Sequence, residues 1–149
     1  MLDLLTTAMK GKFMRSYSIV FAVLCLSVTA FAGKMERDMM TKKVAPAVAT
    51  AMTNLKSSCG CDVQITVDET TLTSMEELRG AMHIAEDVGK SVGKYCSDAA
   101  SKKAICQMKT LSLTKSKDVG FTFKDGAGVA TTDGNARCGW DQMIKVLDK

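Results

Sequence analysis

The chain has 149 residues, a formal net charge of +4 and a hydrophobic content of 46%. This length suits one domain with a single hydrophobic core. Basic and acidic residues are interleaved, whereas a nucleic-acid footprint needs clustered basic residues, so the composition argues against a nucleic-acid partner.

Residues 14–32 have the features of an export signal. Arg15 supplies a positive start, an uncharged and largely apolar run of 14 residues begins at Ile19, and small residues occur at Ala30 and Ala32, where a signal peptidase reads the chain. As a helix, this run would be only about 21 Å long, too short for a hydrocarbon core of about 30 Å. The pattern therefore favours a cleaved signal over a membrane anchor.

We predict that residues 1–32 are a signal peptide, with Met14 as an alternative start of translation. Removing 32 of the 149 residues leaves 117, enough for a single small α+β domain over residues 33–149. The expected location is the periplasm or the extracellular space, and we expect no membrane span in the mature chain.

Disulfides are the next expectation. Loss of Cys25 with the signal leaves five of the six cysteines in an oxidising compartment, where pairing is the rule. On one continuous helix Cys96 and Cys106 would be about 15 Å apart, so a bridge between them requires the helix to end near Cys96. Turn-forming residues follow Cys96, and we predict this bridge. A second bridge is expected between Cys138 and either Cys59 or Cys61.

The first predicted element is a helix over residues 35–55, where apolar residues recur at steps of three to five. Pro46 interrupts it, so the helix is either kinked near Ala45 or begins at Pro46. A half-buried strand follows, because apolar residues alternate with polar ones. The apolar residues of this strand are Val63, Ile65 and Val67.

Residues 75–95 predict a second, longer helix. Thr73 or Ser74 can cap it, and Glu76 or Glu77 completes a capping box. Glycines in this segment either let a neighbouring element approach closely or mark a fraying end. These glycines are Gly80, Gly89 and Gly93.

After Cys106 the pattern changes to three strands, marked by alternating apolar residues around Leu111, Phe121 and Val129. Asp125 and Gly126 form a strong hairpin signal between the last two strands. Apolar residues at i, i+3, i+4 and i+7 then predict a short amphipathic helix at the end of the chain. These residues are Trp140, Met143, Ile144 and Leu147.

The expected fold class is α+β: a four-stranded, mainly antiparallel sheet with helices on one face, in the order α-β-α-β-β-β-α, cross-linked by disulfides.

Cys59 and Cys61 are the most suggestive chemical group. Two thiols around one glycine could cycle between dithiol and disulfide, and thiols with methionines are soft ligands that suit copper. Redox pairs usually have two intervening residues at a helix start, whereas this pair precedes a strand. We therefore favour a structural role, and keep thiol–disulfide redox or soft-metal handling by Cys59 and Cys61 as the alternative.

His83 is the only histidine, so any histidine-dependent mechanism must use it. It lies beside the apolar stripe of the second predicted helix, next to Met82, which favours a structural role. We assign no catalytic residue, cofactor or metal site.

The sequence leads by elimination to an exported, non-enzymatic module that binds another exported or envelope protein, as an inhibitor, an immunity-type factor or an envelope assembly factor. Loops on a cross-linked scaffold commonly carry recognition. The candidate contact residues lie in the predicted hairpin loops: Asp118, Gly120, Asp125, Gly126 and Gly128.

Overall fold

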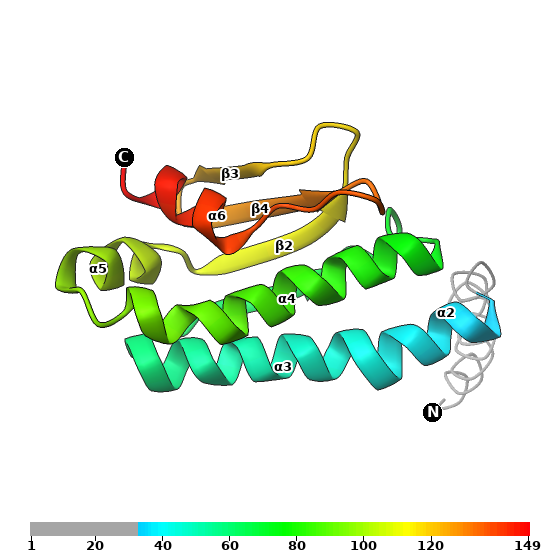
Figure 1. Cartoon of the computed structure of the whole chain (residues 1–149), viewed down its shortest axis with the longest axis horizontal. Helices are drawn as coiled ribbons and strands as arrows, with labels where there is room; N and C mark the ends of the chain where they lie inside the picture. Colours follow the sequence, from blue (N-terminus) through cyan, green and yellow to red (C-terminus); the bar gives the residue numbers. More distant parts are fainter. Residues whose placement is uncertain (1–32) are drawn as a thin grey trace, which may run out of the picture. The chain divides into compact units, whose positions relative to one another are not determined.

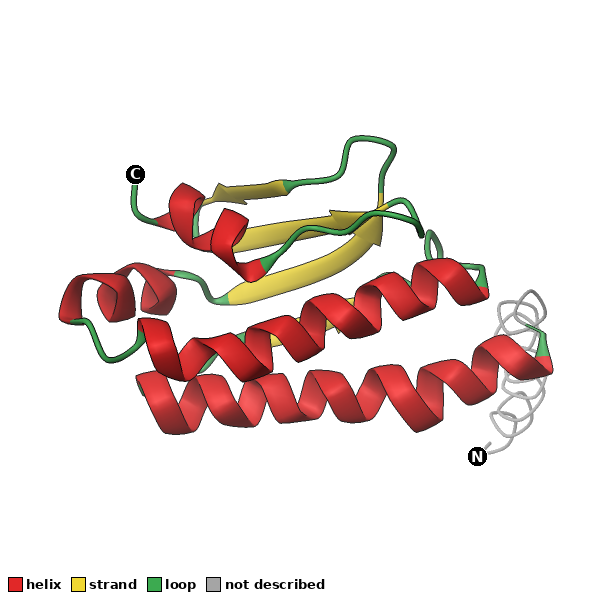
Figure 2. Cartoon of the chain, in the orientation of Figure 1, coloured by secondary structure: helices red, strands yellow, loops and turns green. Residues whose placement is uncertain are grey.

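Two long helices lie side by side beneath a four-stranded sheet in the computed structural model (Figure 1). The structure describes residues 33–149, so the predicted signal peptide lies outside the described residues. The helices form one layer and the strands the other (Figure 2).

The first helical segment runs without a break from Lys34 to Cys59. It consists of α2 (Lys34–Met39), a π-helical turn (Met40–Val44), α3 (Ala45–Asn54) and a second π-helical turn (Leu55–Cys59). Pro46 explains the first π turn, because proline has no N–H to donate and its ring crowds the carbonyl of the preceding turn. A wider turn before Pro46 relieves this crowding, and the helix continues.

Strand β1 (Gln64–Val67) leads to α4 (Met75–Tyr95), whose predicted bounds are confirmed. The capping box is also confirmed, with Ser74 and Glu77 as its members. The Ser74 hydroxyl accepts a hydrogen bond from the Glu77 N–H at 3.3 Å, and the Glu77 carboxylate accepts one from the Ser74 N–H at 2.9 Å. Both orphan donors at the helix start are thereby satisfied.

Helix α5 (Ala99–Gln107) was not predicted. Asp98 caps it by accepting a hydrogen bond from the Ser101 N–H at 2.8 Å. The sequence pattern predicts a loop here, closed by a Cys96–Cys106 bridge, although aspartate, as at Asp98, is a common N-cap residue. The observed order is therefore α-β-α-α-β-β-β-α rather than the predicted one.

The remaining elements are β2 (Thr110–Lys115), β3 (Phe121–Lys124), β4 (Ala127–Thr132) and α6 (Trp140–Leu147). The sheet order is β1-β2-β4-β3. Strands β1, β2 and β4 are parallel, and only β3 is antiparallel to its neighbour β4. The predicted four-stranded α+β architecture is confirmed, but the mainly antiparallel pairing is wrong, because the sheet is mixed.

Two connections explain the mixed pairing. Helices α4 and α5 lie between β1 and β2, and a helical crossover of this kind joins parallel strands. After β2 the chain passes to the edge of the sheet as β3, and β4 returns between β2 and β3. This return uses a tight turn in which Asp125 and Gly126 both have positive φ, 51° and 82°, as a two-residue type I′ hairpin requires.

The core lies between the sheet and the helices. Alternate residues of the strands point into it, and α6 packs over β3 on the same side. Fully or nearly fully buried residues on this inner face are Ile65, Leu111, Leu113, Phe121 and Ala130. Asp87 of α4 anchors α6 by accepting a hydrogen bond from the Trp140 N–H at 2.8 Å.

Gly80 brings α4 close to the sheet. A Cβ at this position would lie 2.3 Å from Oγ1 of Thr132, the last residue of β4. The Thr132 hydroxyl is held in place, since it donates to the Ala136 carbonyl at 2.6 Å and accepts from the Gly134 N–H at 3.1 Å. Close approach, rather than fraying, explains this glycine.

Gly80→Ala should therefore lower the free energy of unfolding by roughly 1–3 kcal/mol, because the added methyl must displace a buried, hydrogen-bonded side chain. Gly93→Ala is the matched control, since the nearest atom to its Cβ, the Ser58 hydroxyl, is 4.0 Å away. This control should raise the free energy of unfolding by up to about 1 kcal/mol through helix propensity. Urea unfolding measures both, and equal effects would contradict the packing explanation.

Candidate functional site

The cysteines of residues 33–149 form two bridges, Cys59–Cys96 and Cys61–Cys106, with Cα–Cα distances of 5.2 and 5.1 Å. The predicted Cys96–Cys106 bridge is wrong, because the unpredicted helix α5 separates these two residues. The predicted bridge from Cys138 is also wrong, since Cys138 is a free, buried cysteine.

Gly60 makes this arrangement possible. It ends the first helical segment in the left-handed region, with φ 71°, as a glycine after a helix commonly does. The turn at Gly60 points the two neighbouring cysteines in different directions. Cys59 is bonded to Cys96 at the end of α4, and Cys61 is bonded to Cys106 at the end of α5. Cys59 and Cys61 therefore belong to separate bridges, and both residues are at least 96% buried.

Thiol counting tests this connectivity. A protein of residues 33–149, denatured without reduction, should contain one reactive thiol per chain, that of Cys138. In the native protein this thiol should not react at neutral pH, because burial and the nearby Asp87 raise its pKa to about 11. Titration with a thiol reagent measures both states. A native protein with two reactive thiols, or a fragment map linking Cys96 to Cys106, would contradict the assignment.

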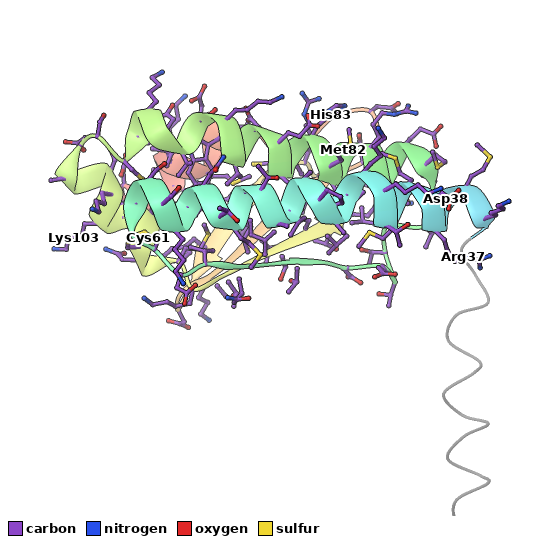
Figure 3. All side chains as sticks on the ribbon, turned by 90° about the horizontal axis from the view of Figure 1, so that it is seen from below. Arg37, Asp38, Cys61, Met82, His83 and Lys103 are labelled. Carbon is purple, nitrogen blue, oxygen red and sulfur yellow. A yellow bond between two sulfur atoms is a disulfide. The ribbon has the colours of Figure 1, made fainter. Side chains whose placement is uncertain are left out.

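His83 lies on α4 next to Met82 (Figure 3). Its Nδ1 atom is 3.3 Å from Oε2 of Glu86, and its side chain is about two-fifths exposed, at 38%. The hydrogen bond from His83 is the largest cause that lowers the pKa of Glu86. His83 is thus a partner of a surface carboxylate on its own helix.

The two predicted contact loops lie at opposite ends of β3. Asp118 and Gly120 precede this strand, whereas Asp125 and Gly126 follow it, so the loops are about 13 Å apart along four strand residues. Gly128 is not in a loop. It is buried within β4, where a Cβ would lie 2.8 Å from a side-chain atom of Phe121.

The face of the sheet that points away from the helices connects these two loops. No element of residues 33–149 packs on it, and its central row is defined by the strand register. This row crosses all four strands in the order Thr66, Ser112, Val129 and Thr122. We call these four residues, with Thr110, Thr114 and Thr131, the open face. Its residues are half-buried or exposed.

Hydroxyl groups of the open face form hydrogen bonds between neighbouring strands and to the Asp118–Gly120 loop before β3. Thr66 and Ser112 share a hydrogen bond of 3.2 Å across β1 and β2. The Thr131 hydroxyl accepts from the Gly120 N–H at 2.8 Å and lies 3.0 Å from the Asp118 carbonyl, to which it can donate. The loop before β3 is therefore anchored to the face. The alternating polar residues of the strands are the sequence signal for this surface.

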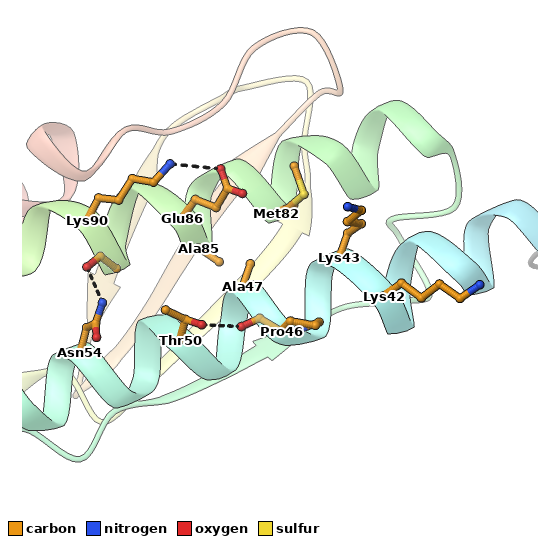
Figure 4. A pocket seen from close by; sticks show the side chains of 11 residues that line it. Lys42, Lys43, Pro46, Ala47, Thr50, Asn54, Met82, Ala85, Glu86 and Lys90 are labelled. Atoms are coloured by element: carbon orange, nitrogen blue, oxygen red, sulfur yellow. Dashed lines mark hydrogen bonds and ion pairs between the residues drawn. The ribbon is translucent and has the colours of Figure 1, made fainter.

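A groove of about 340 Å³ lies on the other side of the molecule, between α3 and α4 (Figure 4). The π-helical turn before α3 contributes two lysines to it, α3 contributes mainly small residues, and α4 contributes Met82, small residues and one acid–base pair. The residues that line it are Lys42, Lys43, Pro46, Ala47, Thr50, Asn54, Met82, Ala85, Glu86, Gly89 and Lys90. The sequence did not predict this groove, because it depends on which helices become neighbours.

An ion pair between the buried Glu77 carboxylate and Lys115 lies at the end of the parallel strand β2. The Glu77 carboxylate accepts from the Thr73 N–H at 2.7 Å and from the Ser74 N–H at 2.9 Å. Its other oxygen lies 2.5 Å from the Lys115 ammonium. Burial alone would raise the pKa of Glu77, but Lys115 and the two N–H groups outweigh it and lower the pKa to about 2. With its oxygens taken, this carboxylate joins α4 to β2 rather than binding a ligand.

Because the pKa of Glu77 falls from an ordinary 4.5 to about 2, its contribution to stability is complete above about pH 4.5 and is lost as the pH falls toward 2. The loss should be on the order of 3 kcal/mol. Glu77→Gln keeps an oxygen for the backbone N–H groups but removes the charge, so it should be less stable at pH 7 and depend less on pH.

Glu76→Gln is the control. Glu76 is exposed and lies in the same helical turn as Glu77, so this substitution removes an equal charge without breaking the ion pair between Glu77 and Lys115. Chemical unfolding between about pH 7 and pH 2 should give a curve for this control that runs parallel to that of the wild-type protein. If the curve for Glu77→Gln is also parallel, the assignment of the stability to Glu77 is incorrect.

Within residues 33–149, no three histidine, cysteine or acidic side chains gather closely enough to hold a metal ion. No helix in the same range combines the length and the apolar character that crossing a membrane requires.

Comparison with protein-family models, curated proteins and solved structures finds no match for this chain. The fold defines it as a disulfide-cross-linked α+β domain with a mixed four-stranded sheet.

Proposed function

We propose that this chain is an exported, non-enzymatic module that binds another exported or envelope protein through the open face and the two loops beside it. The observation that carries the proposal is the uncovered side of β1, β2 and β4. All-parallel sheets almost always have both faces covered, and three of the four strands here are parallel to one another, yet within residues 33–149 only one face of the sheet is covered. A partner protein would supply the second layer.

The composition of the open face supports a protein partner. Its hydroxyl groups can donate and accept hydrogen bonds, and Val129 places an apolar group at its centre. A mixture of polar groups around apolar carbon is typical of non-obligate interfaces. The same hydroxyls let the face remain in water when no partner is bound.

Rigidity also supports the proposal. Thr131 holds the Asp118–Gly120 loop, and the Gly126 carbonyl accepts from the Lys109 N–H at 2.7 Å. Both loops are thus positioned before any contact is made, which lowers the entropy cost of association. The two disulfides fit an oxidising compartment and serve here as cross-links.

The experiment begins with capture of partners from the exported fraction on immobilised mature protein, followed by purification of the captured protein. Its affinity is then measured for Ser112→Arg and Thr122→Arg, which place a bulky charge on the open face. Each should weaken binding at least about tenfold, because the centre of an interface carries most of its energy. Thr53→Arg, at an exposed position of α3, is the matched control and should bind as the wild type does.

Circular dichroism and thermal unfolding must show that the three variants fold. If Ser112→Arg and Thr122→Arg bind as tightly as the wild-type protein, or if Thr53→Arg weakens binding equally, the open face is not the contact surface.

A further inference from the structure

We propose that the groove between α3 and α4 is a second, independent site, which docks an acidic amphipathic helix of a partner protein. This site goes beyond the open face, because it lies on the side of the helices that points away from the sheet. Figure 4 shows its lining side chains in front of the helices, with the strands behind them.

The groove exists because small residues let the two helices approach each other. A Cβ at Gly89 would lie 3.4 Å from the Ala51 Cα, and the Asn54 side-chain amide donates to the Gly89 carbonyl at 2.8 Å. Ala47 and Ala85 continue this floor toward the start of the helices. A close pair of helices with small residues between them leaves a long depression, rather than the ridge that larger side chains would make.

The shape of the groove suits a third helix. Its residues from the first helical segment recur at helical steps, as Lys43, Ala47, Thr50 and Asn54, and those of α4 recur in the same way from Met82 to Gly89. Side chains of one helix form ridges that fit the grooves of another. From Lys42 to Asn54 the site is about 18 Å long, which corresponds to about three turns of a bound helix.

The floor of the groove is largely apolar, because it is lined by Pro46, Ala47, Met82, Ala85 and Gly89. The Thr50 hydroxyl donates to the Pro46 carbonyl at 2.9 Å, and the Asn54 amide donates to Gly89. The Thr50 hydroxyl hydrogen and one of the two Asn54 amide hydrogens are thus already used within the protein. A docking helix should therefore place apolar residues, spaced at i, i+3 or i+4 and i+7, along the floor.

The charged residues that line the groove determine which residues should flank the apolar stripe of the docking helix. Three lysines line the groove against a single acid, Glu86. Lys42 is 3.1 Å from Asp38 and Lys90 is 3.6 Å from Glu86, but both lysines are more than two-thirds exposed, so these pairs are weak and exchangeable. Lys43 has no ion-pair partner among the described residues. Acidic residues on both sides of the apolar stripe would complement these lysines, as in paired helices.

Two other occupants fit less well. A second copy placed symmetrically on the groove would bring its own lysines against these lysines, which is repulsive. A flat anionic membrane would contact the lysines but leave the concave floor empty.

The test uses a synthetic, labelled peptide with leucines at i, i+3 or i+4 and i+7 and glutamates on both flanks, of about 15 residues so that it can span the groove. Fluorescence anisotropy measures its binding to the mature protein at low salt. Two control peptides are used. One replaces every glutamate by lysine, and the other has the same composition in an order without an apolar stripe. Only the first peptide should bind, and added salt should weaken it.

Three protein variants locate the site. Lys43→Glu should weaken binding at least about tenfold at low salt, and Thr50→Trp should abolish it by filling the groove from an exposed position. Lys103→Glu is the charge-matched control, because Lys103 is an exposed residue of α5 at the far end of the molecule from Asp38 (Figure 3). It should change binding less than about twofold.

Several results would overturn the proposal. Absence of peptide binding, equal binding of either control peptide, or equal loss in Lys103→Glu would each do so. Co-sedimentation with anionic vesicles that Thr50→Trp does not reduce would indicate a membrane surface instead. A dimer in sedimentation equilibrium that Thr50→Trp dissociates would indicate a second copy. Ser112→Arg, on the open face, should bind the peptide as the wild-type protein does. The proposal for the open face and the proposal for the groove can therefore fail independently of each other.

Discussion

Helix α4 contacts α3 on one side and the sheet on the other, and two of its glycines set both distances. Gly80 admits Thr132 of β4, and Gly89 admits the backbone of α3 at Ala51. Both candidate surfaces depend on this arrangement. Within residues 33–149 the open face is uncovered because the helices that contact the sheet pack on its other side, and the groove exists because α3 and α4 approach closely.

The two ends of this layered arrangement are held by different chemistry. At one end, Cys59 and Cys61 link the first helical segment to α4 and α5. At the other end, Glu77 joins the start of α4 to Lys115 at the end of β2. The covalent end is insensitive to mild acid, whereas the ionic end weakens as Glu77 is protonated. The elements between them are therefore held at both ends, by covalent bonds at one and by an ion pair at the other.

Local patterns predicted the elements that depend on nearby residues. Ser74 and Glu77 marked the start of α4, and the apolar spacing from Trp140 to Leu147 marked α6. Asp125 and Gly126 marked a hairpin because both must adopt positive φ. The same approach missed α5, where a good N-cap at Asp98 precedes a segment with a weak apolar stripe. It also missed both candidate surfaces, because the open face and the groove require knowing which elements are neighbours.

By itself, the sequence determined helices α4 and α6, the strands and the hairpin, and it predicted an export signal, since each of these depends on residues only a few positions apart. The tertiary structure alone decided the strand order, the partners of the cysteines and the position of the groove. Five cysteines are compatible with many pairings, and only the placement of α5 brings Cys106 to Cys61 and leaves Cys138 buried and free. The physical reason is that these features depend on contacts between residues distant in sequence, which local periodicity does not encode.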